Sequence, residues 1–385
     1  MSIEGELSIR LDWDGARVIG VAIRSTRPVV AGRLLAGKGA REAASMLPRL
    51  YSICGRAQAA AAHRAIDAAT GTESASANAG ALENAVLLET VQEYLWRLLI
   101  DWPQAMGRQP SIAAVAPVRR QLAAAIVRQH ANEDAPALLA HEVAAALDAL
   151  AADHVYGESP TLFLARGDAG AFDAWAATAA TLPASLAATL LATAPGLGRS
   201  ATALMPTADA SGLLEAVVPG LRCDAEFARA PLWNGMTVET GALARNCDQP
   251  MMASLLQREG RAVVTRMAAR LVELASLLGS LRAAAVTGTS GIGWVAALTL
   301  EPGDGLAAVQ TARGLLLHRA RLAHGRVVDY QIVAPTEWNF HPAGPLVQGL
   351  EGMEVADASV LSRQARLAIQ ALDPCVACSV EVVHA

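Results

Sequence analysis

Two cysteines near the C-terminal end of the chain have the spacing of a metal-ligand pair. Cys375 and Cys378 form a CxxC sequence, and Cys54 lies far upstream of them. A CxxC brings two thiolates within reach of one ion, and soft thiolates select zinc, copper(I), nickel or iron over hard cations. A structural zinc normally has four ligands, but the sequence contains no second CxxC and no regularly spaced Cys/His pair. The spacing therefore indicates a split metal site that is not an ordinary zinc site.

A redox function fits the position of the CxxC pair poorly. A thioredoxin-like pair lies at a strand-to-helix junction, whereas Cys375 follows a helical stretch near the tail. Cys54 is expected near the N-terminus of an Ala-rich helix over residues 57–69, where the partial positive charge of the helix favours a thiolate. The plainer alternative for all three cysteines is that they are small buried apolar residues.

The elements that must position these cysteines are mostly helical. Period-two alternation and turn residues predict two hairpins, with turns at Asp14-Gly15 and at His324-Gly325. The strands of these hairpins are predicted over residues 3–11, 17–23, 314–321 and 327–333. Helices are predicted over residues 39–69, 82–102, 113–152, 250–282 and 359–371, the second ending at Pro103.

The composition excludes several classes of protein. The chain has 385 residues, a net charge of -5 and no basic stripe, so we expect no nucleic-acid partner. The uncharged run 174–198 is interrupted by prolines, and we expect no membrane span. Five cysteines give no disulfide framework and the N-terminus lacks a signal-peptide pattern, so we expect a cytoplasmic protein. The Gly-rich segment 288–293 lacks the residues of a phosphate-binding loop and is predicted to be an ordinary loop.

Six stretches, in the same order and over nearly the whole chain, resemble the large subunit of nickel-iron hydrogenases. They are residues 3–7 (IEGEL) with the following Asp14-Gly15, residues 52–55 (SICG), residues 241–245 (GALAR), residues 312–314 (ARG), residues 330–339 (YQIVAPTEWN) and residues 373–378 (DPCVAC). Any one of these similarities is weak, but six in order are specific. The middle third of the chain resembles the family poorly.

The chain departs from this family at the metal ligands. In the family four thiolates, two from each cysteine motif, hold nickel, and the second of each pair also bridges to an iron that carries cyanide and carbon monoxide. Here Ala57 occupies the position of one bridging cysteine. Ala61 replaces a histidine, with His63 two residues late, and Glu381 replaces another. The sequence ends at Ala385, and we expect no removable extension of the kind that most of these enzymes carry.

The resemblance implies roles for five residues. Cys378 occupies a bridging position, which implies an iron ligand, and Cys54 and Cys375 occupy terminal nickel positions from which they would complete the coordination of iron. Arg313 and Thr336 occupy positions that face the cyanides in the family, and a guanidinium and a hydroxyl are suitable donors for such anions. For Arg313 the alternative is an ordinary surface charge on a strand.

The resemblance also implies a fold. We expect an α+β fold like that of the nickel-iron hydrogenase large subunit, made mainly of long helices with small antiparallel β regions. We expect residues 1–385 to form a single unit. Its parts would be an N-terminal β-hairpin over 1–25, a helical body over 39–285, and a C-terminal β region with the metal-site tail over 286–385.

The similarity is closest to HupK/HoxV-type hydrogenase maturation proteins. It implies a non-enzymatic scaffold that carries the Fe(CN)2(CO) fragment, without nickel, and passes it to a hydrogenase large subunit. The expected partners are that subunit, the general iron-loading maturation proteins and their small chaperone. Two alternatives share the fold: a divergent, catalytically active hydrogenase, against which Ala57 argues, and a metal-free structural subunit, against which the retained cysteines argue.

Four other residues bear on these alternatives. Glu4 matches a proton-relay glutamate of the enzymes, but a solvated strand carboxylate is at least an equal interpretation. Cys223 and Cys247 match no cysteine motif and are expected to be structural. His384, second from the end, is left open as a weak metal ligand.

Overall fold

The computed structural model of the chain describes residues 5–26, 31–51, 54–72, 76–131, 136–207, 209–224 and 226–385. The chain divides into two units, each built from segments that are far apart in the sequence. The first unit comprises Met1–Leu82, Gly198–Arg245 and Gly293–Ala385, and the second comprises Glu83–Leu197 and Asn246–Ile292. All five predicted site residues belong to the first unit. The prediction that the whole chain forms a single unit stays a prediction.

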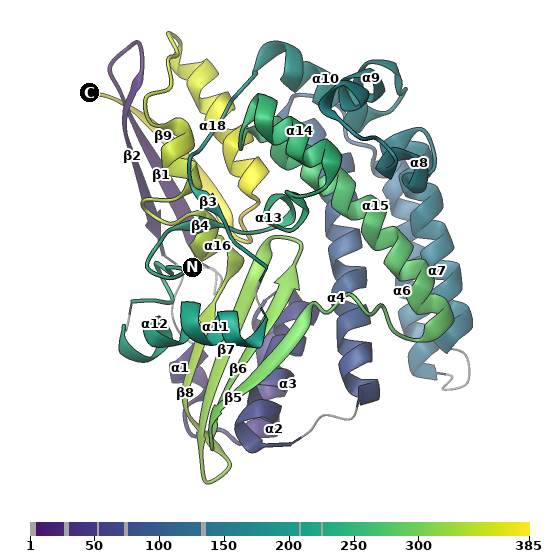
Figure 1. The fold of residues 1–385 in the computed structure, drawn as a ribbon, viewed down its shortest axis with the longest axis vertical. Helices are drawn as coiled ribbons and strands as arrows, with labels where there is room; N and C mark the ends of the chain where they lie inside the picture. Colours follow the sequence, from purple (N-terminus) through teal and green to yellow (C-terminus); the bar gives the residue numbers. More distant parts are fainter. Residues whose placement is uncertain are drawn as a thin grey trace. The chain divides into compact units, whose positions relative to one another are not determined.

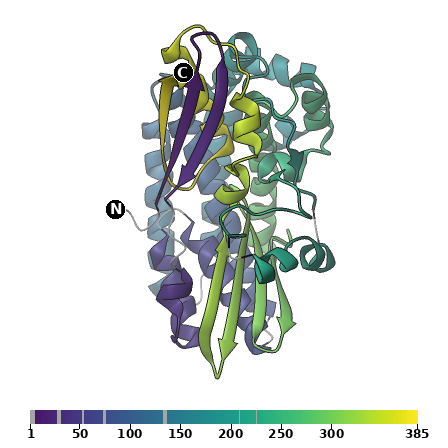
Figure 2. The ribbon, with the colours of Figure 1, turned by 90° about the vertical axis from the view of Figure 1, so that its left-hand side faces the viewer.

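The N-terminal and C-terminal strands lie side by side in one sheet of the first unit (Figure 2). Strand β1 (Glu6–Trp13) pairs antiparallel with β2 (Val18–Ser25) and parallel with β9 (Ala377–His384). Leu7, Ile9 and Leu11 of β1 are at most 1% exposed, as the period-two pattern predicts. The N-terminal hairpin is therefore confirmed. Strand β9 and its parallel pairing are not predicted by the sequence pattern.

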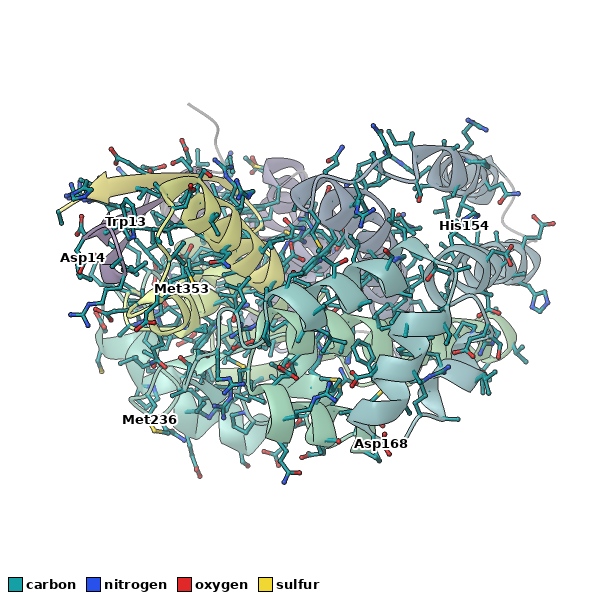
Figure 3. The ribbon with its side chains drawn as sticks, turned by 90° about the horizontal axis from the view of Figure 1, so that it is seen from above. Trp13, Asp14, His154, Asp168, Met236 and Met353 are labelled. Atoms are coloured by element: carbon teal, nitrogen blue, oxygen red, sulfur yellow. The ribbon has the colours of Figure 1, made fainter. Side chains whose placement is uncertain are left out.

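The turn end of this hairpin is tied to the segment that precedes the C-terminal helix. Trp13 Nε1 donates a hydrogen bond to the Val355 carbonyl at 2.8 Å, and the Val18 N–H donates to the Met353 carbonyl at 3.0 Å. Figure 3 shows Trp13 and Asp14 at the same end as Met353. Two helices flank this segment, α17 (Pro345–Leu350) and α18 (Ala358–Leu372), and α18 leads into β9.

A four-stranded antiparallel sheet forms a second β region of the first unit (Figure 1). Its strands, in spatial order, are β5 (Val295–Glu301), β6 (Asp304–Thr311), β7 (Gly314–Ala323) and β8 (Arg326–Val333). His324 and Gly325 connect β7 to β8 with φ values of 51° and 71°, as a two-residue hairpin turn requires. The predicted hairpin with its turn at His324-Gly325 is confirmed, whereas β5 and β6 are not predicted by the sequence pattern.

Helix α3 (Gly55–Thr70) packs on one face of this sheet. At Gly305 of β6 a Cβ would lie 2.2 Å from the Ala65 carbonyl oxygen, so only glycine permits this approach of helix and strand. Ala62, Ala65 and Ile66 of α3 join Ala307 of the sheet in a buried cluster. The same part of the chain contains α1 (Ala31–Leu35), α2 (Ala40–Met46) and the 3-10 helix η1 (Leu47–Leu50).

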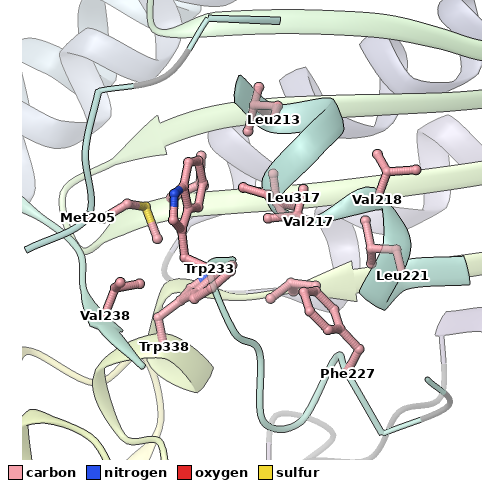
Figure 4. Packing of buried hydrophobic residues seen from close by; sticks show 14 of the residues in the cluster. Met205, Leu213, Val217, Val218, Leu221, Phe227, Trp233, Val238, Leu317 and Trp338 are labelled. Carbon is pink, nitrogen blue, oxygen red and sulfur yellow. The ribbon is translucent and has the colours of Figure 1, made fainter. Parts of the chain in front are cut away.

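A second buried apolar cluster covers the opposite face of the sheet (Figure 4). It contains Trp233, Phe227 and Trp338 with Leu317 of β7, and the rings of Phe227 and Trp338 meet edge to face at 6.3 Å. The surrounding elements are β3 (Ala203–Leu204), α11 (Ala210–Ala216), α12 (Val218–Cys223), β4 (Val238–Glu239), α13 (Ala242–Asn246) and α16 (Pro335–Asn339). The sheet is thus packed on both faces.

The second unit is helical. Its elements are α4 (Ser76–Trp96), which begins before the unit's boundary, the π-helical turn η2 (Arg97–Asp101), α5 (Trp102–Ala105), α6 (Ile112–Ala131), α7 (Pro136–Ala151), the π-helical turn η3 (Ala152–Tyr156), α8 (Pro160–Leu164), α9 (Ala169–Thr178), α10 (Leu182–Thr193), α14 (Pro250–Glu259) and α15 (Val263–Thr287). Across the described residues no helix is both long enough and apolar enough to cross a membrane.

Two predicted helix boundaries in this unit are wrong. The stretch 250–282 is not one helix, because Gly260, with a φ of 67°, ends α14 before α15 begins. The helix predicted to end at Pro103 continues to Ala105, because Pro103 lies in the first turn of α5, where its missing N–H costs nothing.

Candidate metal centre

The CxxC pair lies between a helix and an edge strand of the first unit. Helix α18 ends at Leu372, the following Asp373 has a φ of 54°, and the chain then passes through Pro374 and Cys375 into β9. The Cys375 side chain is buried at 8% exposure, whereas Cys378 is partly exposed and lies opposite Leu7 in the parallel pairing of β9 with β1. The pairing of the two ends of the chain therefore fixes the position of Cys378.

Thr336 contacts the CxxC segment directly. Its hydroxyl donates to Cys375 Sγ at 3.1 Å and accepts the Cys375 backbone N–H at 3.2 Å. Thr336 is 1% exposed and lies in α16, which begins with Pro335 at a helix position that tolerates proline. The structure thus places this predicted cyanide-facing residue against a thiol.

Arg313 is buried and faces a carboxylate. It lies in the tight turn between β6 and β7, and its Nε is 3.5 Å from Asp373 Oδ1, with the two side chains 3% and 2% exposed. The alternative of an ordinary surface charge is therefore wrong. Because Asp373 stands two residues before Cys375, the ion pair connects the turn at Arg313 to the metal-site tail.

Asn339 connects three segments around the site, those of Thr240, Arg313 and Leu372. Its Oδ1 accepts the Thr240 N–H at 2.9 Å, and its Nδ2 lies within donating distance of the carbonyls of Thr240, Arg313 and Leu372, at 3.1, 3.3 and 3.5 Å. Gly314, with a φ of 127°, allows the close approach, since a Cβ there would lie 2.3 Å from the Thr240 side chain. Asn339 is 2% exposed, so one buried amide satisfies backbone groups from three distant segments.

Cys54 stands at the N-terminus of α3, as predicted. It is the residue immediately before the helix, and its carbonyl accepts the Gln58 N–H at 2.9 Å. The Gln58 side-chain amide returns to the same residue, because its Nε2 lies 3.5 Å from Cys54 Sγ. Gln58 is 1% exposed within an Ala-rich helix, so its amide belongs to the buried environment of this thiol.

The two thiols of the CxxC are electrostatically coupled. Burial raises the pKa of the Cys378 thiol to about 12, and the neighbouring Cys375 and Glu6 add smaller contributions in the same direction. Cys378 therefore holds its proton at neutral pH, and a metal ion that binds it must displace that proton. The chain's five cysteines, all in the described part, form no disulfide.

The described residues contain no group of three or more His, Cys, Asp or Glu side chains arranged to hold a metal ion. The structure brings Cys375, Cys378 and Thr336 together, and it links Arg313 to them through Asp373. It does not place Cys54 with the CxxC pair in one such group, and the three-thiolate ligand set stays a prediction. Glu4 lies outside the described residues, as do Ser52 and Ile53 of the first cysteine motif.

The positions that depart from the hydrogenase pattern are structurally ordinary. Ala57 and Ala61 are fully buried in α3, whereas His63 and Glu381 are exposed. His384 is exposed, and its ring meets that of Trp13 edge-on at 5.5 Å. Among the described residues, none of these histidines belongs to a group that could hold a metal ion.

Sequence reasoning missed three residues that support the site. Asp373 and Asn339 lie inside the hydrogenase-like stretches, but their roles depend on partners from distant segments. Gln58 had a detectable signal, because it is a polar residue surrounded by alanines on a helix that must be buried.

The two remaining cysteines differ in exposure. Cys223 is exposed, and burial raises the pKa of Cys247, with a smaller contribution from Asp248.

Comparison with known proteins gives consistent results. A nickel-dependent hydrogenase family model matches residues 224–381. The chain is 33% identical to the hydrogenase expression/formation protein HoxV of Cupriavidus necator, covering 97% of this chain and 96% of that protein. It is 31% identical to HupK of Rhizobium leguminosarum bv. viciae, covering 99% and 97%.

A solved structure shows the same fold. The Ni-Fe-Se hydrogenase from D. vulgaris Hildenborough superposes with a TM-score of 0.61 at 15% sequence identity, covering 94% of each chain. This similarity confirms the predicted hydrogenase large-subunit-like fold. Because the sequence similarity to HoxV and HupK extends over nearly the whole of both chains, this chain belongs to the family of HoxV and HupK hydrogenase expression/formation proteins.

Proposed function

We propose that the chain is a non-enzymatic maturation scaffold, which carries the Fe(CN)2(CO) fragment and transfers it to a hydrogenase large subunit. The observation that carries this proposal is the retained CxxC pair, held by Thr336 and by the Asp373 ion pair inside a large-subunit-like fold. The names of its relatives, hydrogenase expression/formation proteins, support a role in making a hydrogenase.

The thiols supply suitable ligands for iron as a cargo. Thiolate is a soft donor, and Cys375 and Cys378 are close enough for the charge on one to raise the pKa of the other. Binding of the cargo would release the Cys378 proton and relieve this repulsion, because both sulfurs would then share one cation. Cys54 would complete the ligand set once its side chain joins the pair.

The missing fourth thiolate favours release. Ala57 is fully buried one helical turn after Cys54 and offers no ligand atom. In the family two bridging thiolates hold the iron, and here Ala57 replaces one of them, so transfer to a large subunit that offers both bridging thiolates is expected to be favourable. The same absence argues against hydrogen turnover by a nickel-iron pair.

Arg313 and Thr336 are proposed to recognise the anionic cyanides of the cargo. A guanidinium has five N–H donors, so Arg313 can contact Asp373 and a cyanide together. The Thr336 hydroxyl can rotate from Cys375 Sγ toward a second acceptor. Both groups are almost fully buried, where hydrogen bonds to an anion are strongest.

The proposed partners are the hydrogenase large subunit, the iron-loading maturation proteins and their small chaperone. A transfer experiment tests the proposal. The chain is purified without oxygen from cells that make the maturation proteins and are fed 57Fe, and is then mixed with a metal-free large subunit. The label is expected to move to the large subunit, as measured by mass spectrometry of the separated proteins.

Two variants sharpen the transfer experiment. Ala57→Cys restores the second bridging thiolate and is expected to slow transfer several-fold, whereas the matched control Cys223→Ser, at an exposed cysteine outside the site, should transfer at the wild-type rate. Retention of the label by the wild-type chain would contradict the carrier function.

Two observations favour a metal-free structural function instead. Over the described residues no three ligand side chains are gathered around a common point, and Cys378 is a protonated thiol at neutral pH. Under this alternative the anaerobically purified chain would contain no iron, with or without Cys378.

A further inference from the structure

A chain of buried hydrogen bonds runs from the thiol of Cys54 into the sheet. Gln58 Nε2 contacts Cys54 Sγ at 3.5 Å, and Gln58 Oε1 contacts His318 Nε2 at 2.9 Å. His318 Nδ1 in turn contacts the Tyr330 hydroxyl at 2.8 Å. Gln58 comes from α3, His318 from β7 and Tyr330 from β8, and all three are at most 2% exposed. Three separate elements therefore build one connection to the thiol.

The direction of this chain follows from the proton of Tyr330. Burial raises the pKa of Tyr330 well above its ordinary value, so the hydroxyl keeps its proton. A hydroxyl can donate and accept, but the partner of this one among the described residues is His318 Nδ1, and a buried hydroxyl proton without an acceptor is unfavourable. The favoured arrangement therefore has Tyr330 donating and His318 Nδ1 accepting. Burial lowers the pKa of His318 to about 3, so the ring is neutral and its proton lies on Nε2. His318 Nε2 then donates to Gln58 Oε1.

This sequence of bonds decides which end of the Gln58 amide faces the thiol. Because Oε1 is occupied by His318, the NH2 group is directed at Cys54 Sγ. An N–H donor stabilises sulfur in its anionic form, and Cys54 also lies at the positive N-terminal end of α3. Both features are suited to an anionic sulfur that is bound to a metal ion.

We infer that Gln58 is a positioning residue that holds an N–H donor against Cys54 Sγ, and that His318 and Tyr330 fix its orientation. Its role toward the cargo rests on the proposed function, because it concerns Cys54 as an iron ligand. A hydrogen bond donated to a metal ligand orients that ligand and tunes the metal that it holds. The orientation itself is a property of this chain and can be tested without the cargo.

The first test uses nuclear magnetic resonance of the metal-free protein with 15N-labelled histidine, with His318→Gln to assign the signal. At pH 7 His318 is expected to show a protonated Nε2 and an unprotonated Nδ1. In Tyr330→Phe the proton should no longer be confined to Nε2. A wild-type ring protonated on Nδ1 would overturn the inference, because the Gln58 carbonyl would then face Cys54.

The second test uses infrared spectroscopy of the loaded protein. Removing the N–H donor in Gln58→Leu makes the sulfur a stronger electron donor to iron, so the carbonyl stretching band should move to lower wavenumber. Tyr330→Phe, which does not contact Cys54, should move the band in the same direction by less. Tyr156→Phe, which removes another buried hydroxyl, one bonded to Leu271, is the matched control and should leave the band unchanged.

The two tests separate the inference from the proposed function. If the wild-type protein showed no cyanide or carbonyl bands, the proposed carrier function would be refuted. The histidine signal would still decide the orientation of Gln58. Bands that are present but do not move in Gln58→Leu and Tyr330→Phe would refute the role of Gln58 while the carrier function stands.

Discussion

Thr336 and Cys375 hold each other through two hydrogen bonds in opposite directions. The hydroxyl donates to the sulfur at 3.1 Å and accepts the backbone N–H of the same cysteine at 3.2 Å. A thiol held in this way has one orientation before any ligand arrives, so the Cys375 sulfur is preorganised by α16. The mutual bond also means that a change at Thr336 affects both the fold of the tail and the ligand.

Replacing Thr336 with valine is expected to destabilise the protein by about 1–3 kcal/mol, because the buried Cys375 N–H loses its acceptor. Thr336→Ser keeps the hydroxyl and should retain most of the stability. Thr178→Val, at an exposed threonine that bonds only its own helix, is the control and should change stability by no more than about 0.5 kcal/mol. Urea unfolding measures the differences, and equal effects of the two valine variants would contradict the account.

Asn339→Leu is expected to cost about 3 kcal/mol or more, because it leaves one buried N–H and three carbonyls without their shared partner. Asn339→Asp keeps the acceptor for Thr240 but sets a carboxylate against three carbonyls, so it should also destabilise. Amide hydrogen exchange should show faster opening of the segments around Thr240, Arg313 and Leu372 together. Exchange that accelerates in only one of them would show that Asn339 does not couple all three.

His318 should make stability depend on pH. Its folded pKa of about 3 lies below the ordinary value of 6.5, so the unfolded chain binds the proton between these values and the folded chain does not. The free energy of unfolding should therefore rise with pH from about 3 to 6.5. Between pH 7 and pH 5 the loss from this residue is about 2 kcal/mol. Urea unfolding of His318→Gln should lack this part of the slope, and an identical slope would contradict the assignment.

The cysteines should differ in their reactivity toward iodoacetamide. Burial raises the pKa of Cys378 to about 12, so at pH 8 only about one part in ten thousand is thiolate, and exposed Cys223 should be labelled much sooner. Leu7→Ala, which is expected to cost about 2–5 kcal/mol at the parallel pairing with β9, should speed labelling of Cys378. Mass spectrometry of each site gives the rates, and early labelling of Cys378 in the wild-type protein would be inconsistent with its burial.

Local sequence patterns were sufficient for both hairpins, because alternation and turn residues are carried by neighbouring positions. The turn at His324-Gly325 is an example, since both residues adopt positive φ. The parallel pairing of β1 with β9 is different. It places Leu7 beside Cys378, and nothing in either strand specifies a partner at the other end of the chain.

The ligand candidates of the site are readable from the sequence, but the residues that hold them are not. The CxxC spacing marks Cys375 and Cys378 directly. The partners of Asn339 are backbone groups of three segments, and the carboxylate of Asp373 meets Arg313 only after folding. Such contacts depend on tertiary structure. For this reason the sequence alone left open whether Arg313 is a surface charge, and only the fold shows that it is buried.

Infrared spectroscopy of the chain purified without oxygen, from cells that make the full maturation machinery, shows whether the chain carries the Fe(CN)2(CO) fragment. We expect cyanide and carbonyl stretching bands in the wild-type protein and in Cys223→Ser, and their loss in Cys378→Ala. An absence of these bands in intact wild-type protein, together with an absence of iron, would contradict the carrier function and favour a metal-free structural subunit.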